Sequence, residues 1–304
     1  LAEQYKMPQI FEKQNLDLLH VPHFNVPVLY KGKFVVTIHD LIHHKFEEYA
    51  ATTKNPIVFK LKRFAYKKVI EHAVKKSAHI ITPSNFVKED VINTFKVSPE
   101  KIAVTYEAAE EEYFKSKKTN SKSPYILYVG NAYPHKNLNN LLDAIKLLTF
   151  NKNNPLIKLI IISPRDVFSQ RLISEIESRG LQKHVELKGY QDPEQLSTLF
   201  SRSFAYVFPS LSEGFGIPGL NAMAARIPLL SSNIPVLKEV YGDAAIYFDP
   251  KSPKDIAEKI EKLFQDEKLK TDLIKREEKQ VQKYSWAQMA TKTLSIYDKF
   301  DSKH

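Results

Sequence analysis

The chain has 304 residues, 43% of them hydrophobic and 11% aromatic, so it can form two globular domains or one large domain with a buried core. It has no cysteine, which excludes disulfides, thiolate metal sites and cysteine nucleophiles and is typical of a reducing compartment such as the cytoplasm. No apolar run approaches the ~20 residues that a membrane-spanning helix needs, and a formal net charge of +10 indicates an anionic partner.

The first part of the chain alternates short apolar runs with amphipathic segments. The predicted elements are a helix at residues 3–14, strands at 16–20, 34–38, 78–82 and 102–105, and helices at 54–76 and 85–95. Because such alternation is typical of parallel βαβ units, we predict a doubly wound domain over residues 1–108. Three or four strands are few for such a sheet and the sequence begins at Leu1 rather than methionine, so the domain is expected to be incomplete.

The basic excess of this first part lies in the predicted helix at residues 54–76, which holds eight lysines and arginines against one acid, Glu71. Apolar residues recur every four positions, which predicts one face packed inward and lysines facing outward. The predicted inward residues are Ile57, Leu61, Ala65, Val69 and Ala73, with Tyr66, Ile70 and Val74 beside them. A solvated surface is the simplest interpretation, and contact with an anionic membrane surface is the functional alternative. Nucleic acid is not expected as a partner, because no base-stacking or base-reading motif accompanies the charge.

Residues 109–123 change to charged and small polar types, which predicts a linker. Alternation then resumes and predicts a second domain over residues 124–284. Its predicted strands lie at residues 125–129, 156–162, 185–188, 204–208, 229–231 and 244–248. Six strands make a complete Rossmann-like sheet. The loop after its first strand has a single glycine, Gly130, instead of the dinucleotide fingerprint, which argues against an NAD or FAD enzyme.

The most unusual stretch follows the predicted strand at residues 204–208, because three of the chain's eight glycines lie between positions 214 and 219. A helix with Pro218 in its first turn is predicted to follow. Glycine allows positive φ and close approach of a ligand to the backbone, and a helix start attracts anions. Glu213 would repel a phosphate, so it is better placed to accept hydrogen bonds from a sugar attached to that phosphate. A structural turn without a ligand is the alternative interpretation.

Two motifs give this region a family resemblance. They are Glu213-Gly214-Phe215-Gly216-Ile217-Pro218, followed by Ala222-Met223-Ala224, and Glu239-Val240-Tyr241-Gly242-Asp243-Ala244-Ala245. Together they resemble the donor-site signature of family 4 glycosyltransferases, which are retaining, nucleotide-sugar-dependent enzymes of the GT-B fold. The resemblance covers nearly the whole chain and implies an α/β protein of GT-B type with two Rossmann-like doubly wound domains.

The resemblance also sets expectations for the two ends of the chain. A C-terminal helix at residues 285–304 is expected to cross back to the first domain. A further strand-helix-strand unit with a glycine-rich acceptor loop is expected ahead of the first domain. Its absence from this sequence implies a truncated chain, a reduced enzyme or a partner chain that supplies the unit.

The resemblance places three catalytic candidates at strand ends. Lys136 matches the lysine that meets the donor diphosphate and offsets charge on the leaving group; the alternative is a solvated lysine, although a cation near a helix start is mildly unfavourable. His39 matches a histidine near the donor sugar and acceptor, where a hydrogen bond to the sugar is expected more than acid-base catalysis. Glu213 is expected to accept hydrogen bonds from hydroxyls of the transferred sugar. His39, His43 and His44 do not lie on a clear helix, so no metal site is expected.

Further residues are expected to bind the donor. These substrate-binding candidates are Gly130, Asn131, Tyr190, Gly214, Phe215, Gly216, Ile217 and Asn221. The backbone amides of residues 215–217 would hold the sugar and diphosphate, and Tyr190 would either meet the base or simply pack. Three positions depart from the family pattern: Asn131 replaces a frequent arginine, Asn221 replaces a glutamate that binds the nucleotide ribose, and Arg226 stands where glycine is common. An amide at Asn221 would bind a diol more weakly than a carboxylate does.

We therefore predict a glycosyltransferase that moves a hexose from a nucleoside diphosphate sugar to a glycan or lipid-linked acceptor with retention of configuration, without a metal or other cofactor. The alternative is a catalytically weakened or inactive paralogue that binds sugar nucleotides or glycans, which the three departures and the missing N-terminal unit favour. The expected location is the cytoplasm or the inner face of the membrane, with the helix at residues 54–76 as the contact with anionic lipid.

Overall fold

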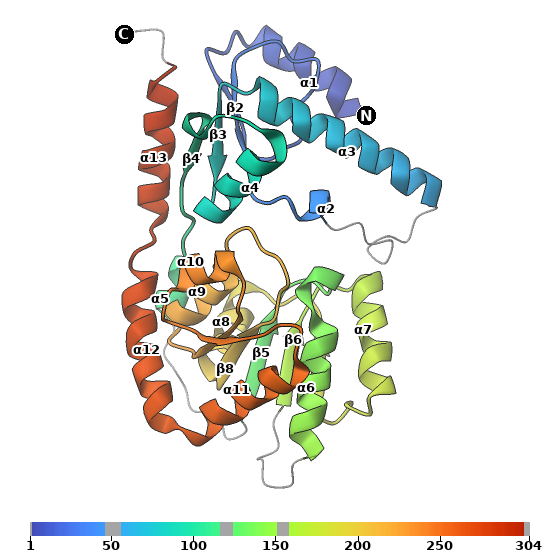
Figure 1. The fold of residues 1–304 in the computed structure, drawn as a ribbon, viewed down its shortest axis with the longest axis vertical. Helices are drawn as coiled ribbons and strands as arrows, with labels where there is room; N and C mark the ends of the chain where they lie inside the picture. The colour runs from blue at the N-terminus through green and yellow to red at the C-terminus, as the bar shows by residue number, and fades with distance from the viewer. Residues whose placement is uncertain (1, 46–55, 116–123, 151–157, 301–304) are drawn as a thin grey trace. The chain divides into compact units, whose positions relative to one another are not determined.

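The computed structural model describes residues 2–45, 56–115, 124–150 and 158–300. The chain divides into two compact units: unit 1 comprises residues 1–107 and 285–304, and unit 2 comprises residues 108–284. Each unit is a parallel β-sheet with helices packed against it (Figure 1). Within the described ranges, no helix combines the length and the apolar character that crossing a bilayer requires.

The sheet of unit 1 has the strand order β1-β2-β3-β4, with parallel neighbours throughout. Its strands are β1 (Leu19–Val21), β2 (Phe34–Thr37), β3 (His79–Thr82) and β4 (Ile102–Val104). Its helices are α1 (Ala2–Lys13), α2 (Ile42–Lys45), α3 (Pro56–Lys76), α4 (Asn85–Phe95), the 3₁₀ turn η2 (Pro99–Lys101) and α13 (Trp286–Asp298). Strands β2 and β3 are buried along their whole length, as is usual for central strands of a parallel sheet covered on both faces.

Alternate residues of β2 and β3 supply two separate cores. Val36 and Ile80 belong to the cluster that α3 and α4 cover. Their neighbours Val35 and Ile81 point to the opposite face of the sheet and pack against Ile296 of α13. Helix α13, at the C-terminal end of the described chain, is therefore an integral layer of unit 1.

Helix α3 presents only part of the inward face that the sequence predicts. Leu61 is 69% exposed and Ala65 is also exposed, although the four-residue spacing predicts that both face inward. The inward side holds Tyr66, Ile70, Ala73 and Val74, Val69 is half-buried, and the side chain of Ile57 lies outside the described residues. An α-helix has ~3.6 residues per turn, so a spacing of four drifts by ~40° at each step and cannot stay on one face over five positions.

The sheet of unit 2 has the order β10-β9-β8-β5-β6-β7 and is also parallel throughout. Its strands are β5 (Tyr125–Val129), β6 (Lys158–Ile162), β7 (Val185–Lys188), β8 (Ala205–Phe208), β9 (Leu229–Ser232) and β10 (Ile246–Phe248). Its helices are α5 (Glu111–Phe114), η3 (Pro134–Lys136), α6 (Leu138–Phe150), α7 (Val167–Ser178), α8 (Pro193–Arg202), α9 (Ile217–Ala224), α10 (Pro235–Tyr241), α11 (Pro253–Gln265) and α12 (Glu267–Val281). The two parallel sheets confirm the predicted α/β class with two sheet-containing domains.

The strand order of unit 2 reverses between β5 and β8. The chain runs from β5 to β6 and β7 on one side, and then crosses to β8, β9 and β10 on the other. In parallel α/β sheets, ligands bind outside the carboxyl ends of the strands at such a switch point. The segments that follow β5 and β8 contain Lys136 and Glu213, so the topology brings two predicted site residues to this point.

The segment predicted as a linker begins with a packed helix. Helix α5 belongs to unit 2, and its Tyr113 is 3% exposed, with its ring centre 4.8 Å from that of Phe200. The residues around Tyr113 are mostly acidic, so composition alone did not predict that this segment is packed. Residues 116–123 of the predicted linker lie outside the described residues.

Candidate active site

Lys136 and Glu213 form an ion pair at the switch point of unit 2. The Lys136 Nζ is 2.6 Å from Glu213 Oε1, and the two side chains are only 15% and 11% exposed. Lys136 ends the turn η3 that follows β5, and Glu213 follows β8. The ammonium also lies 5.8 Å from the centre of the Phe208 ring. Two candidates from distant parts of the sequence therefore share one largely buried polar site.

Asn137 holds the two loops in place. It adopts the left-handed conformation, with φ 61, and its buried side-chain amide donates to the Pro209 carbonyl at 3.0 Å and to the Pro250 carbonyl at 2.6 Å. The backbone N–H of Leu211 adds a bond to the His135 carbonyl at 2.8 Å. These bonds fix the segments that carry the ion pair. The one sequence signal for Asn137 is its residue type, because asparagine tolerates positive φ better than most residues.

Gly216 and Gly219 leave room for the buried side chain of Tyr241. The Tyr241 hydroxyl donates to the Gly216 carbonyl at 2.6 Å, and a Cβ atom on either glycine would overlap that hydroxyl. Gly216 also has φ 112, which residues with a side chain rarely adopt. Burial raises the pKa of Tyr241 well above its ordinary value, so the hydroxyl stays a proton donor. The glycine spacing thus serves internal packing, a role that the motif alone did not indicate.

The glycine loop leads into α9, which contains Pro218 in its first turn as predicted. Phe215 is 3% exposed and packs edge to face on Tyr284, with ring centres 5.7 Å apart. This packing holds the Phe215 side chain in the interior of unit 2. The N–H groups of a first helical turn lack helical acceptors and carry the positive end of the helix dipole. Residues 214–216 directly precede α9, and Ile217 is its first residue. Their roles in binding stay predictions.

Asn221 contributes to the fold of unit 2. It is 8% exposed, and its Oδ1 accepts a hydrogen bond from the backbone N–H of Glu110 at 2.9 Å. This bond joins the start of α5 to α9. Ribose binding by Asn221 stays a prediction, and the side-chain oxygen that would take part already has a partner.

Gly130 and Asn131 shape the turn at the carboxyl end of β5. Gly130 has φ 154, and an added Cβ there would lie 2.8 Å from the Tyr128 hydroxyl. That hydroxyl donates to the Asn131 carbonyl at 2.9 Å, and Asn131 Oδ1 accepts from the Tyr133 N–H at 3.4 Å. Both residues therefore sit at the predicted strand end, and their contact with a substrate stays a prediction.

A pocket of 350 Å³ lies at the carboxyl ends of β6 and β7. Its lining residues are Arg165, Gly189, Tyr190 and Gln191. Tyr190 is 82% exposed, so it does not have the packing role that was the alternative to binding. A Cβ on Gly189 would lie 3.0 Å from Arg165 Nε, so the glycine lets the guanidinium stem approach the backbone. Arg165 was not predicted, and its position just after β6 is the signal that could have found it.

His39 lies in unit 1, just past the carboxyl end of β2. Its Nδ1 is 3.1 Å from Glu107 Oε1 and its Nε2 is 3.1 Å from the Pro22 carbonyl oxygen. A carboxylate and a carbonyl only accept hydrogen bonds, so this arrangement suits the doubly protonated imidazolium form of His39, in which both ring nitrogens donate. The hydrogen bond with Glu107 raises the pKa of His39, against the opposing effect of burial. Both partners therefore favour the protonated ring, and the catalytic role of His39 stays a prediction.

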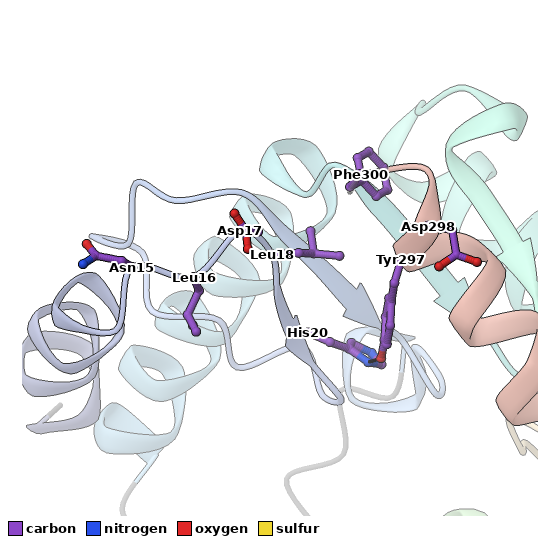
Figure 2. Close-up of a pocket in the computed structure, with 8 residues that line it drawn as sticks. All are labelled: Asn15, Leu16, Asp17, Leu18, His20, Tyr297, Asp298 and Phe300. Atoms are coloured by element: carbon purple, nitrogen blue, oxygen red, sulfur yellow. Dashed lines mark hydrogen bonds between the residues drawn. The ribbon is translucent and has the colours of Figure 1, made fainter. Parts of the chain in front are cut away.

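Unit 1 also has a pocket of 470 Å³ where the segment before β1 meets α13 (Figure 2). Its lining residues are Asn15, Leu16, Asp17, Leu18, His20, Tyr297, Asp298 and Phe300. His20 contacts the Tyr297 hydroxyl through Nδ1 and lies 2.9 Å from Thr37 Oγ1 through Nε2. Burial, followed by the nearby charge of His39, lowers the pKa of His20. The eight lining residues include none of the predicted site residues.

The chemistry of the unit 2 site follows from its polar groups. An ammonium and a helix start favour an anionic group, and a carboxylate accepts hydrogen bonds from hydroxyls. Among the described residues, no group of three or more histidine, aspartate or glutamate side chains is arranged to hold a metal ion.

Comparison with known proteins adds the family. Residues 109–280 match the family model of the Glycosyl transferases group 1, and residues 1–112 match that of Glycosyltransferase Family 4. The chain is similar to the O-antigen chain mannosyltransferase RfbU of Salmonella typhimurium, at 30% identity over 240 residues that cover 79% of this chain and 63% of RfbU. It is also similar to the O-antigen chain mannosyltransferase B of Escherichia coli, at 26% identity over 291 residues, or 92% of this chain and 74% of that one. The chain therefore spans less than two thirds of RfbU.

The fold is similar to that of the Anabaena protein HepE, whose crystal structure is a complex with UDP-glucose. The TM-score is 0.78 at 14% identity, and the match covers 97% of this chain and 82% of HepE. Such a likeness shows the fold alone and confirms the predicted GT-B type. The family models and the fold lead to one conclusion: the chain belongs to the glycosyl transferases group 1, the family 4 glycosyltransferases.

Proposed function

We propose that this protein transfers mannose from a nucleoside diphosphate mannose to a growing glycan, with retention of configuration and without a metal ion. The observation that carries the proposal is the Lys136–Glu213 pair, 2.6 Å apart and largely buried at the switch point of unit 2, just before the start of α9. Both curated relatives are named O-antigen chain mannosyltransferases, which supports mannose as the sugar and a glycan as the acceptor.

The proposed reaction breaks the bond between the anomeric carbon and a phosphate oxygen. Both electrons of that bond stay on the departing diphosphate, whose growing charge the Lys136 ammonium and the first turn of α9 offset. The acceptor hydroxyl forms the new bond to the anomeric carbon and gives its proton to the departing phosphate oxygen. Glu213 accepts hydrogen bonds from the hydroxyls of the transferred sugar and so holds the ring in place.

Binding of such a donor would exchange one set of partners for another. In the structure, Lys136 and Glu213 form an ion pair with each other, and their side chains are 15% and 11% exposed, respectively. A phosphate beside the ammonium and a sugar hydroxyl beside the carboxylate would replace this contact without leaving either charge unpaired. A ligand that brings only one of the two groups would leave the other charge largely buried and without a partner, which is unfavourable. The pair therefore favours a phosphorylated sugar over a free sugar or a free phosphate.

We propose that the nucleoside occupies the pocket lined by Arg165, Gly189, Tyr190 and Gln191. The ring of Tyr190 is 82% exposed and can stack on a base. The pocket volume of 350 Å³ suits a nucleoside. The HepE complex with UDP-glucose supports a nucleotide sugar as the class of donor. We further propose that the protein works in the cytoplasm, which its cysteine-free sequence suits.

The test is a nucleotide-release assay with GDP-, UDP- and ADP-linked sugars, with and without mannose-containing acceptors, paired with calorimetric titration of each donor. Turnover with a mannose donor, and an NMR spectrum of the product with the anomeric configuration of the donor, would support the proposal. Binding without release would favour the alternative of an inactive paralogue, for which the engagement of Asn221 by Glu110 is the one structural argument. Release with inverted configuration, or no binding of any sugar nucleotide, would contradict the proposal.

A further inference from the structure

Helix α3 of unit 1 carries large apolar side chains on the side that faces away from the core. Val58, Leu61 and Phe64 are 43%, 69% and 61% exposed. Each residue turns ~100° about the helix axis, so Leu61 and the fully buried Ile70, nine positions later, lie on opposite sides of α3. The helix therefore presents one apolar face to the core and a second one outward.

Basic side chains border this outward face. Helix α3 carries seven lysines and arginines and one acid, Glu71. Lys60 and Lys67 are exposed and lie ~100–120° around the axis from Leu61, which places them on one border of the apolar strip. Lys68 lies within the strip, with its Nζ 5.8 Å from the centre of the Phe64 ring. The single acid lies 2.6 Å from Lys75 and 3.8 Å from Lys68, so it offsets one of the seven positive charges and the helix stays strongly basic.

We propose that this outward face of α3, formed by Val58, Leu61 and Phe64 with Lys60 and Lys67 at its border, binds an anionic lipid surface. The apolar side chains enter the layer below the headgroups, and the lysines reach the lipid phosphates through their flexible stems. This inference goes beyond the proposed reaction and does not depend on it.

Other occupants fit the face less well. A solvated surface explains the lysines, but it does not explain three large apolar side chains along one strip. A second copy of the chain would bring two faces of the same charge together, which is unfavourable. Nucleic acid would pair with the lysines and leave Leu61 and Phe64 without a role. An anionic bilayer surface uses both kinds of side chain.

The cysteine-free sequence makes a direct test possible. A Leu61→Cys variant can be labelled at one site with a polarity-sensitive fluorophore and mixed with vesicles of phosphatidylglycerol and phosphatidylcholine. The matched control is Leu294→Cys on α13, where the native side chain is 57% exposed. We expect a blue shift and increased emission at position 61 and no change at position 294. Equal responses at both positions, or none at position 61, would overturn the proposal.

Vesicle sedimentation of unlabelled variants separates the two contributions. The Leu61→Ser/Phe64→Ser variant should bind these vesicles ~100-fold more weakly, since each apolar side chain contributes ~10-fold. The Lys60→Gln/Lys67→Gln variant should bind ~20-fold more weakly, and wild-type binding should fall with added salt and on pure phosphatidylcholine. The controls are Ile173→Ser/Leu294→Ser, at two exposed apolar positions, and Lys275→Gln/Lys279→Gln, at two exposed positions of α12.

The outcomes discriminate between occupants. The proposal holds if only the α3 variants lose vesicle binding while all variants keep the wild-type unfolding midpoint. Sedimentation equilibrium of the wild type and the Leu61→Ser/Phe64→Ser variant would show a dimer that dissociates if a second copy covers this face, and that result would refute the lipid assignment. The assignment would equally fail if the lysine variants lost oligonucleotide binding and the apolar variant bound vesicles as the wild type does.

Discussion

The Lys136–Glu213 pair of unit 2 and the His39–Glu107 pair of unit 1 both lie near strand ends, but they are built differently. In unit 2 the side chains of Lys136 and Glu213 are 15% and 11% exposed, and the loops that carry them are tied by Asn137. In unit 1 the side chain of His39 is 44% exposed, against 12% for Glu107. The first pair is enclosed and fixed by neighbouring loops, while the second has one open partner.

This difference determines what a substitution reports. Enclosed charges are weakly screened by water and salt, so a change at the unit 2 pair affects both stability and any ligand that replaces it. The open pair of unit 1 is screened by solvent and includes a histidine, so a change there acts on charge more than on the fold. The first region is thus suited to tests of catalysis and the second to tests of pH dependence.

The largest effect is expected at the enclosed pair. Lys136→Met should lower the rate of nucleotide release by on the order of 10²–10³-fold, because it removes a cation that stabilises the leaving group. It should also lower the free energy of unfolding by roughly 1–3 kcal/mol, because Glu213 keeps its charge in a largely buried place without a partner. Turnover and urea unfolding measure the two effects.

A second substitution separates chemistry from stability at this pair. In the variant Lys136→Met/Glu213→Leu no charge remains unpaired, so the free energy of unfolding should recover relative to Lys136→Met while activity stays lost. Recovery of activity together with stability would show that the pair is structural and would refute its proposed role.

The next effect concerns the glycine loop. Gly219 lies in α9, where alanine for glycine usually stabilises a helix by ~1 kcal/mol. Here Gly219→Ala should instead destabilise by about 1–3 kcal/mol, because the added methyl group overlaps the Tyr241 hydroxyl and ring. It should also raise the KM for the donor, since the loop before α9 must shift.

Gly180→Ala is the matched control for this prediction. Gly180 has φ 69 with nothing within 4 Å of an added Cβ, so its substitution adds backbone strain of ~1 kcal/mol without a clash. Its KM for the donor should equal that of the wild type. If the two variants changed KM equally, the link between the Tyr241 packing and the donor loop would be wrong.

Features that depend on the order of residues along the chain could be predicted from the sequence. Alternating buried runs predicted both parallel sheets, and the positions of Lys136 and Glu213 after two strands predicted that they meet, because a doubly wound sheet brings such ends together. The three catalytic candidates, Lys136, Glu213 and His39, each lie in the segment that follows an expected strand. Their binding roles remain predictions that the experiments above address.

The sequence could not supply features that depend on packing between distant side chains. Tyr241 lies in a recognised motif, but its fit against Gly216 and Gly219 requires coordinates. The engagement of Asn221 by the backbone of Glu110 is likewise invisible in composition. The predicted inward face of α3 was confirmed at Ile70, Ala73 and Val74 but wrong at Leu61 and Ala65, because a four-residue repeat was treated as one stripe.

The open pair of unit 1 should control the charge of His39. Glu107→Gln removes the carboxylate that raises the pKa of His39, so this pKa should fall toward the ordinary value of 6.5. A raised folded-state pKa contributes stability that is present below pH 6.5 and is lost as pH rises through the raised value, so the stability difference between wild type and variant should shrink above that range. NMR titration of the His39 ring, assigned with His39→Gln, measures the shift.

Neighbouring groups give an internal check on this titration. Asp40 also raises the pKa of His39, so some of the increase should persist in Glu107→Gln. The charge of His39 contributes to the lowered pKa values of His20 and His23, after burial as the larger cause. These two values should therefore rise slightly when His39 titrates earlier. An unchanged His39 pKa in the variant would show that Glu107 does not stabilise the protonated ring.

The smallest effect is expected at Arg226, which departs from the family pattern just after α9. It has φ 59, the left-handed conformation that favours glycine, and its exposed guanidinium lies 2.7 Å from Glu278. Arg226→Ala keeps the strained backbone and loses the pair, which contributes at most ~1 kcal/mol when exposed. Arg226→Gly loses the same pair but relieves a strain of ~1 kcal/mol, so it should be the more stable of the two variants by about that amount in urea unfolding. Because both changes lie on an exposed surface, away from the enclosed ion pair, turnover should match that of the wild type. A loss of turnover in Arg226→Gly with unchanged stability would instead assign this departure to the chemistry of the site.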